Sequence, residues 1–183
     1  RLGFGSQLFR ERLTVRARAL DAASPILLSD AAGAALAVYA VPYLDPDAAR
    51  ATLAPWSDVP LHRSHASAMA TVVRRVAADL AERRAAGPLP AVLMAHAFVG
   101  GGCASDSERD IRVGGVDAVP AAVFADTGLD YVALGHLHGP QRVGSADGPG
   151  PAMRYAGAPV AMSFSERHQT KSSALVEFGA GGV

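Results

Sequence analysis

Residues 129–138 read LDYVALGHLH, an apolar run that ends in two histidines. The first six residues of this stretch predict a strand buried on both faces of a sheet, because they are almost entirely apolar. His136 and His138 follow that strand and flank a single leucine. If the chain stays extended there, alternation points both imidazoles to the same side. Gly135 allows a sharp backbone turn at this point and leaves room for a bulky ligand.

A second apolar run, AVLMA at residues 91–95, predicts another strand buried on both faces and leads directly into His96. Ahead of it, residues 64–86 carry apolar side chains three and four positions apart, a spacing that predicts an amphipathic helix. Two earlier apolar runs, at residues 25–28 and 35–41, are separated by a glycine-containing turn and predict a hairpin. Strands that alternate with helices in this way favour a layered α/β domain.

Shorter segments complete the expected organisation. Asp45 followed by Pro46 predicts the start of a short helix, because proline suits the first turn. Residues 6–13 and 119–125 have the pattern of two further short helices, and residues 174–178 (ALVEF) that of a last strand.

The chain has 183 residues, of which 50% are hydrophobic and 19% charged. These values fit one ordinary domain with a substantial core rather than a disordered chain. A formal net charge of zero argues against a whole-surface electrostatic grip on nucleic acid, but is compatible with a local site where metal ions face phosphate. Cys103, the single cysteine, cannot form an internal disulfide, which favours a cytoplasmic location. No run of about 18 apolar residues occurs, so we expect no membrane span.

Three histidines are the candidate metal ligands. Active sites of α/β sheets lie beyond the carboxyl ends of the strands. If the two histidine-ending strands are neighbours, His96, His136 and His138 converge at one edge of the sheet. Neutral imidazoles suit a divalent transition metal. A lone histidine at a strand end is more often a hydrogen-bonded structural residue, but the combination favours metal binding.

Three stretches carry a resemblance to a known family: LMAH at residues 93–96, DYVALGHLHGPQ at 130–141 and RYAGAPVAMSFSE at 154–166. They resemble the later motifs of the calcineurin-like metallophosphoesterases. Gly-His-x-His alone indicates only that family, whereas the third stretch, with the nearby Lys171, narrows the resemblance to the SbcD-type nuclease subunits. The opening RLGFGSQL also resembles the stretch that follows the family's Gly-Asn-His-Asp motif.

The resemblance implies a fold and an activity. The fold would be a layered metallophosphoesterase-type β-sandwich flanked by helices, with residues 1–183 as the C-terminal part, a single partial domain. His96 and His136 would bind one of two divalent metal ions, Mn²⁺ or Mg²⁺, and His138 the other. The protein would be a DNA exo- or endonuclease subunit in repair and recombination. Its partners would be DNA and an SbcC-type ATPase subunit, and the intact protein would form a homodimer.

The resemblance is incomplete, because the family takes its bridging aspartate and catalytic histidine from motifs nearer the N-terminus. No Asp-x-His or Asn-His-Asp occurs in the 183 residues, so no catalytic residue is assigned in this chain. Both ends look cut, and we expect the isolated chain to bind metal weakly and to have little nuclease activity. Two alternatives stay open: a metallophosphoesterase for small phosphate esters or cyclic nucleotides, and a non-catalytic module with structural histidines.

Other polar residues have plainer interpretations. His62 and His65 are one helical turn apart and could chelate a metal, but a solvated helix start is the simpler prediction. His168 lies in a polar stretch and is expected at the surface. Cys103 follows three glycines and is expected to be a free thiol in a loop.

The SFSE element at residues 163–166 has two interpretations. It either positions the edge of the site, or forms a turn that Phe164 anchors in the core. Ser165 is not a convincing nucleophile, because no acid–base neighbour is identifiable.

Overall fold

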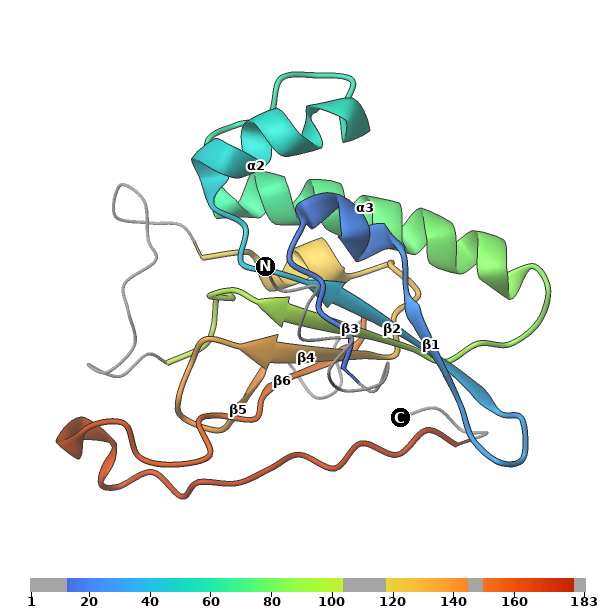
Figure 1. Ribbon diagram of the computed structural model, residues 1–183. Coiled ribbons are helices and arrows are strands. Elements are labelled where there is room, and N and C mark those ends of the chain that lie inside the picture. The colour runs from blue at the N-terminus through green and yellow to red at the C-terminus, as the bar shows by residue number, and fades with distance from the viewer. Residues whose placement is uncertain (1–12, 104–117, 145–149, 180–183) are drawn as a thin grey trace.

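The computed structural model describes residues 13–103, 118–144 and 150–179, which form a six-stranded mixed sheet with helices on one face (Figure 1). The strands lie in the order β1-β2-β3-β4-β6-β5. Strands β2, β3, β4 and β6 run parallel, and β1 and β5 add antiparallel edges. Their bounds are Ile26–Ser29, Ala35–Val41, Ala91–His96, Tyr131–Gly135, Gln141–Val143 and Ala152–Tyr155 for β1 to β6. A layered α/β architecture is thereby confirmed.

Two helices cover one face of this sheet, α2 (Pro46–Leu53) and α3 (His65–Arg84) (Figure 1). Both begin where the sequence predicts, because Asp45 and Ser64 cap them by accepting hydrogen bonds from backbone N–H groups of the first turn. Short 3₁₀ turns complete the helical segments: η1 (Ala19–Ala23), η2 (Ala54–Trp56), η3 (Ala121–Phe124) and η4 (Phe164–Glu166). The helix expected at residues 119–125 is thus the shorter turn η3.

The hydrophobic core lies between α3 and the sheet. Val72, Val76 and Leu80 of α3 are almost fully buried, as are Leu93 of β3 and Val132 of β4. Burying each such side chain contributes about 1.5–3 kcal/mol relative to leaving it in water. The apolar stripe that predicted the helix is therefore the face that holds it on the sheet.

The opposite face of the sheet is less covered. Along β3, Leu93 and Ala95 are buried, whereas Met94 is 50% exposed. The prediction that β3 is buried on both faces is therefore wrong for the residues that the structure describes. Figure 1 shows the chain after β6 passing along this side of the sheet in an extended path.

The chain after β6 also differs from the expectation of a last strand. Residues 174–178 form no strand, and Leu175 is 88% exposed. A strand needs a hydrogen-bonded neighbour, and no described strand pairs with this segment. The helix expected at residues 6–13 falls, except for Leu13, outside the described residues. Within the described ranges, no helix has the length and apolar character needed to cross a membrane.

Candidate functional site

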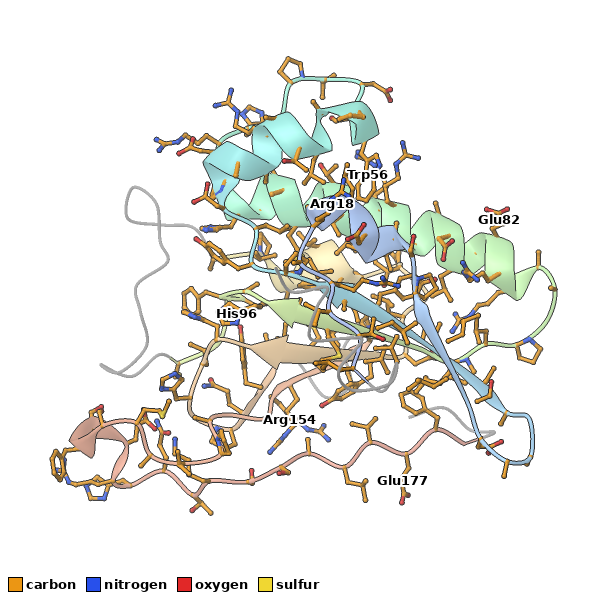
Figure 2. The ribbon with its side chains drawn as sticks, viewed as in Figure 1. Arg18, Trp56, Glu82, His96, Arg154 and Glu177 are labelled. Carbon is orange, nitrogen blue, oxygen red and sulfur yellow. The ribbon has the colours of Figure 1, made fainter. Side chains whose placement is uncertain are left out.

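The carboxyl ends of β3 and β4 lie side by side, as the sequence prediction required. The two strands are parallel neighbours, and their register pairs Ala95 with Leu134 and His96 with Gly135. His96 is therefore the last residue of β3 and stands beside the end of β4 (Figure 2). This is the edge of an α/β sheet at which ligands usually bind.

His96 and His136 meet at this edge. Their ring centroids are 5.4 Å apart, and the two ring planes are inclined at 69°. The ring of Tyr43 lies nearly perpendicular to that of His96, with centroids 6.2 Å apart, and the ring of Phe98 approaches that of His136 at the same centroid distance. Aromatic neighbours on both sides thus hold the two imidazoles next to each other.

The backbone turn that follows β4 lies at His136 rather than at Gly135. His136 has a backbone φ of +123°, a value that residues other than glycine rarely adopt. The chain is therefore not extended through residues 136–138, and simple alternation does not set the direction of these imidazoles. A Cβ added at Gly135 would lie 3.5 Å from Nδ1 of His96, an ordinary van der Waals contact, so the space at this position does not require glycine. A strained non-glycine residue is typical of functional sites, where it costs about 1–3 kcal/mol.

His138 is held by a different set of contacts. Its Nδ1 lies 2.8 Å from Oε1 of Glu166, whose side chain is completely buried. Glu166 also accepts a hydrogen bond from the backbone N–H of Met162 at 3.2 Å and pairs with the ammonium group of Lys171. An ionised carboxylate can only accept hydrogen bonds. In its contact with Glu166, Nδ1 of His138 is therefore the donor and has the proton. A metal ion would then bind His138 through Nε2.

The segment after β6 closes over the His138 loop. Lys171 donates to the carbonyl oxygen of His138 at 3.1 Å, and the N–H of Ala158 donates to the same oxygen at 3.0 Å. Gly157 makes this approach possible, since a Cβ there would lie 2.7 Å from that carbonyl oxygen. The backbone and the ring of His138 are both fixed by residues that come much later in the chain.

The SFSE element at residues 163–166 contacts the site through Glu166 and does not anchor a turn in the core through Phe164. Phe164 is 93% exposed, so the interpretation that it anchors a turn in the core is wrong. Glu166 is the buried member of the element, at 1% exposure. The sequence singles out Glu166, but it contains no signal for its contact with His138.

Tyr155 is a further residue that the sequence reasoning missed. Its hydroxyl donates to the carbonyl oxygen of Ala97 at 2.7 Å and accepts from the N–H of Val99 at 2.9 Å. All of these groups are buried. Tyr155 thereby fixes the backbone that directly follows His96, and only the long-range fold reveals it.

The protonation state of His96 suits metal binding. His96 is exposed overall, yet desolvation of the packed part of its ring lowers its pKa from the ordinary value. The imidazole is therefore neutral at pH 7. The neutral form has the nitrogen lone pair that a metal ion requires.

The described donors form part of a metal shell. Two imidazoles with ring centroids 5.4 Å apart are close enough for each to provide one nitrogen ligand to the same ion, given metal–nitrogen bonds of about 2.0–2.1 Å. In the described parts of the chain, however, no three His, Cys, Asp or Glu side chains are grouped closely enough to hold a metal ion. His138 thus does not join the His96–His136 pair in one three-residue group, and a complete shell needs further ligands.

The remaining candidates are spread over other parts of the fold. His65 is buried at 6% exposure and contacts the Tyr43 hydroxyl through Nε2 at 3.2 Å, so the prediction of a solvated helix start is wrong for it. His62 is exposed and does not share that environment. His168 is exposed, as predicted, and Cys103 is an exposed free thiol.

Fold and site together define an α/β protein with histidines gathered at the carboxyl edge of its parallel strands. Comparison with models of known protein families finds no match. Among curated proteins, the chain is similar to the SbcD subunit of the SbcCD nuclease. The Escherichia coli K12 protein is 38% identical over 104 residues, which are 57% of this chain and 24% of that protein.

Two further relatives have the same name. The Bacillus subtilis protein is 44% identical over 86 residues, which are 47% of this chain and 21% of the relative. The Rhodobacter capsulatus protein is 41% identical over 117 residues, 62% of this chain and 27% of the relative. The chain thus spans about a quarter of the length of the curated relatives it matches. These similarities confirm that the chain is related to the SbcD-type nuclease subunits.

Proposed function

We propose that this chain is part of a metal-dependent DNA exo- or endonuclease subunit of the SbcD type. The observation that carries the proposal is the His96–His136 pair, 5.4 Å apart at the carboxyl edge of the sheet. The relatives that carry the name of a nuclease subunit support the same activity. The protein would hydrolyse DNA phosphodiesters in repair and recombination. Its location would be cytoplasmic.

The residues of this chain would act as metal ligands. His96 and His136 would bind one divalent ion through neutral imidazole nitrogens, and His138 a second ion through Nε2. Two bound ions, Mn²⁺ or Mg²⁺, would supply a hydroxide nucleophile and offset the charge that develops on the phosphate. Tyr43 and Phe98 would keep the first two rings in place, and Glu166 would hold the third.

The open face of the sheet supports the sandwich part of the proposal. Met94 and Leu28 are each about half exposed there, at 50% and 51%, and the extended chain after β6 passes along the same side (Figure 1). Apolar groups on one face of a sheet are normally covered by a second layer. A second sheet would cover them and would complete a metallophosphoesterase-type domain.

The relatives' name bears on the partners of the protein. SbcCD names a nuclease with more than one subunit, so we propose an SbcC-type subunit as partner. That this subunit is an ATPase, that DNA is the substrate and that the intact form is a homodimer are proposed from the family resemblance. For the isolated 183 residues we propose weak metal binding and little nuclease activity, because the described residues lack a three-ligand group.

The test is manganese-dependent cleavage of linear duplex DNA by the full-length natural protein. His136→Ala should lower the cleavage rate at least about 100-fold. Loss of an outer-shell partner of a metal ligand already lowers metal affinity or activity about 10–100-fold, and loss of the ligand itself should cost more. His62→Ala, which removes an exposed histidine, is the matched control and should leave the rate unchanged.

Two results would contradict the proposal. Hydrolysis of p-nitrophenyl phosphate esters without cleavage of DNA would assign the site to small substrates. No cleavage, together with no manganese-dependent rise in melting temperature, would assign the histidines a structural role, since only a ligand that prefers the folded state stabilises it.

A further inference from the structure

Glu166 is a buried acid in an otherwise exposed turn. Its side chain is completely buried, whereas Phe164 and Ser165 before it and Arg167 after it are exposed. Moving a carboxylate out of water costs several kcal/mol unless partners compensate for the lost hydration. The partners of Glu166 must therefore explain why this side chain, alone in its turn, points inward.

Those partners meet at His138. One carboxylate oxygen of Glu166 lies 2.8 Å from Nδ1 of His138. The other accepts from the Met162 N–H and from Lys171, whose side chain is only 14% exposed. Lys171 in turn donates to the carbonyl oxygen of His138 at 3.1 Å and to Oε1 of Gln169 at 2.7 Å. The acid, the base and the histidine thus form one closed network.

We propose that Glu166 and Lys171 are a positioning pair for His138. Glu166 fixes the ring by accepting from Nδ1, which selects the tautomer that has its lone pair on Nε2. Lys171 fixes the backbone through the carbonyl oxygen and holds the carboxylate in place. Ring and backbone of one proposed ligand are therefore set from a segment 28 to 33 residues away. This inference rests on the proposed function, in which His138 binds a metal.

A second consequence is a coupling between the metal and the chain after β6. The contact between Nδ1 of His138 and Glu166 exists when the turn at residues 163–166 is docked, because the carboxylate comes from that turn. A metal ion that requires the oriented ring therefore also favours the docked turn, and by linkage the two effects are equal in size. Binding of the ion should protect the backbone amides of this turn from hydrogen exchange.

The experiment measures Mn²⁺ affinity of the full-length protein by isothermal titration calorimetry. Glu166→Ala should weaken binding about 10–100-fold, the usual effect of removing an outer-shell partner, and Lys171→Met should weaken it about 10-fold. The control is Glu82→Ala, an exposed acid on α3, which should not change the affinity (Figure 2). Nitrogen-15 NMR of the metal-free protein should show His138 protonated at Nδ1, and a mixture of tautomers in Glu166→Ala.

The outcomes separate this inference from the proposed function. If the wild-type protein binds no Mn²⁺, or if His96→Ala does not weaken binding, the proposed function fails. If His96→Ala weakens Mn²⁺ binding while Glu166→Ala and Lys171→Met bind normally with an unchanged His138 tautomer, the positioning role is overturned. Should Glu166→Ala not fold, the near-isosteric Glu166→Gln takes its place. The NH₂ group of glutamine is a donor and cannot accept hydrogen bonds from Lys171 and Met162. We therefore expect the Mn²⁺ affinity of this variant to fall about 10-fold.

Discussion

The two parts of the histidine edge are built in different ways. His96 and His136 are placed by the ends of adjacent parallel strands and by ring contacts with near neighbours. His138, two residues further on, is placed by a buried ionic network with Glu166 and Lys171. The first part depends on strand register, and the second depends on docking of the chain after β6. Substitutions that disturb one part should therefore leave the other largely intact.

The largest effect is expected at Gly157, where the chain after β6 meets the His138 loop. Gly157→Ala should lower the free energy of unfolding by about 3 kcal/mol or more, the sum of backbone strain and overpacking. Its φ is +85°, and the new Cβ would lie 2.7 Å from the His138 carbonyl oxygen and 2.9 Å from Pro140. Urea denaturation measures the change.

The chain offers a matched control for this substitution. Gly33 has the same φ of +85°, but a Cβ there would meet nothing within 4 Å. Gly33→Ala should therefore cost only the backbone strain, about 1–2 kcal/mol. Equal losses at the two glycines would show that the close approach to His138 contributes nothing to stability.

The next largest effect is expected on the His96 side. Tyr155→Phe should lower the free energy of unfolding by about 2–3 kcal/mol, because the buried backbone groups of Ala97 and Val99 both lose their partner. Tyr39→Phe is the comparison: that hydroxyl donates to the partly exposed Asp79 rather than to a buried backbone group, and its loss should cost about 1 kcal/mol. A loss at Tyr155 no larger than at Tyr39 would contradict the role assigned to the buried hydroxyl.

The same contrast explains which features the sequence predicts. Strand β2, helix α3 and the hairpin were predictable because their signals, apolar periodicity, caps and turn residues, lie within each segment. The meeting of His96 and His136 needed only one further assumption, that β3 and β4 are neighbours. The first three features depend on residues close together in the chain, whereas the meeting of His96 and His136 depends on the pairing of two parallel strands.

Features that depend on distant contacts were not predictable in this way. The Glu166–His138 contact joins residues 28 apart, and no local pattern indicates it. His65 was expected in solvent, because a polar helix start usually is, but Tyr43 from the loop after β2 packs against it. The sequence predicted the backbone turn at Gly135, because glycine adopts unusual backbone angles most easily. The structure has the positive φ at His136 instead, and no local sequence pattern indicates this.

A smaller effect is expected from relieving the strain at His136. Both His136→Ala and His136→Gly remove the proposed ligand, but only glycine is at ease at φ +123°. The glycine variant should therefore be more stable than the alanine variant by about 1 kcal/mol. Thermal denaturation of the two variants measures the difference. Equal stabilities would mean that the backbone relaxes once the imidazole is removed, and that ring contacts impose the strained conformation.

The smallest effect is expected in alkali and again concerns the His96 side. Burial raises the pKa of Tyr155 from about 10 to about 12, although the hydrogen bond from the Val99 backbone lowers it in part. The unfolded chain therefore releases this proton at lower pH than the folded protein does. The contribution of Tyr155 to stability is complete below pH 10 and is lost as the pH rises from 10 to 12.

At pH 10.5 this loss should be less than about 1 kcal/mol, since only part of the unfolded tyrosine is ionised. Tyr155→Phe should accordingly show a shallower decline of stability between pH 9.5 and 11 than the wild type, even though it is less stable at neutral pH. Urea denaturation at several pH values measures both slopes. Identical slopes would mean that the Tyr155 hydroxyl ionises as readily in the folded protein as in water, and would contradict the effect assigned to its burial.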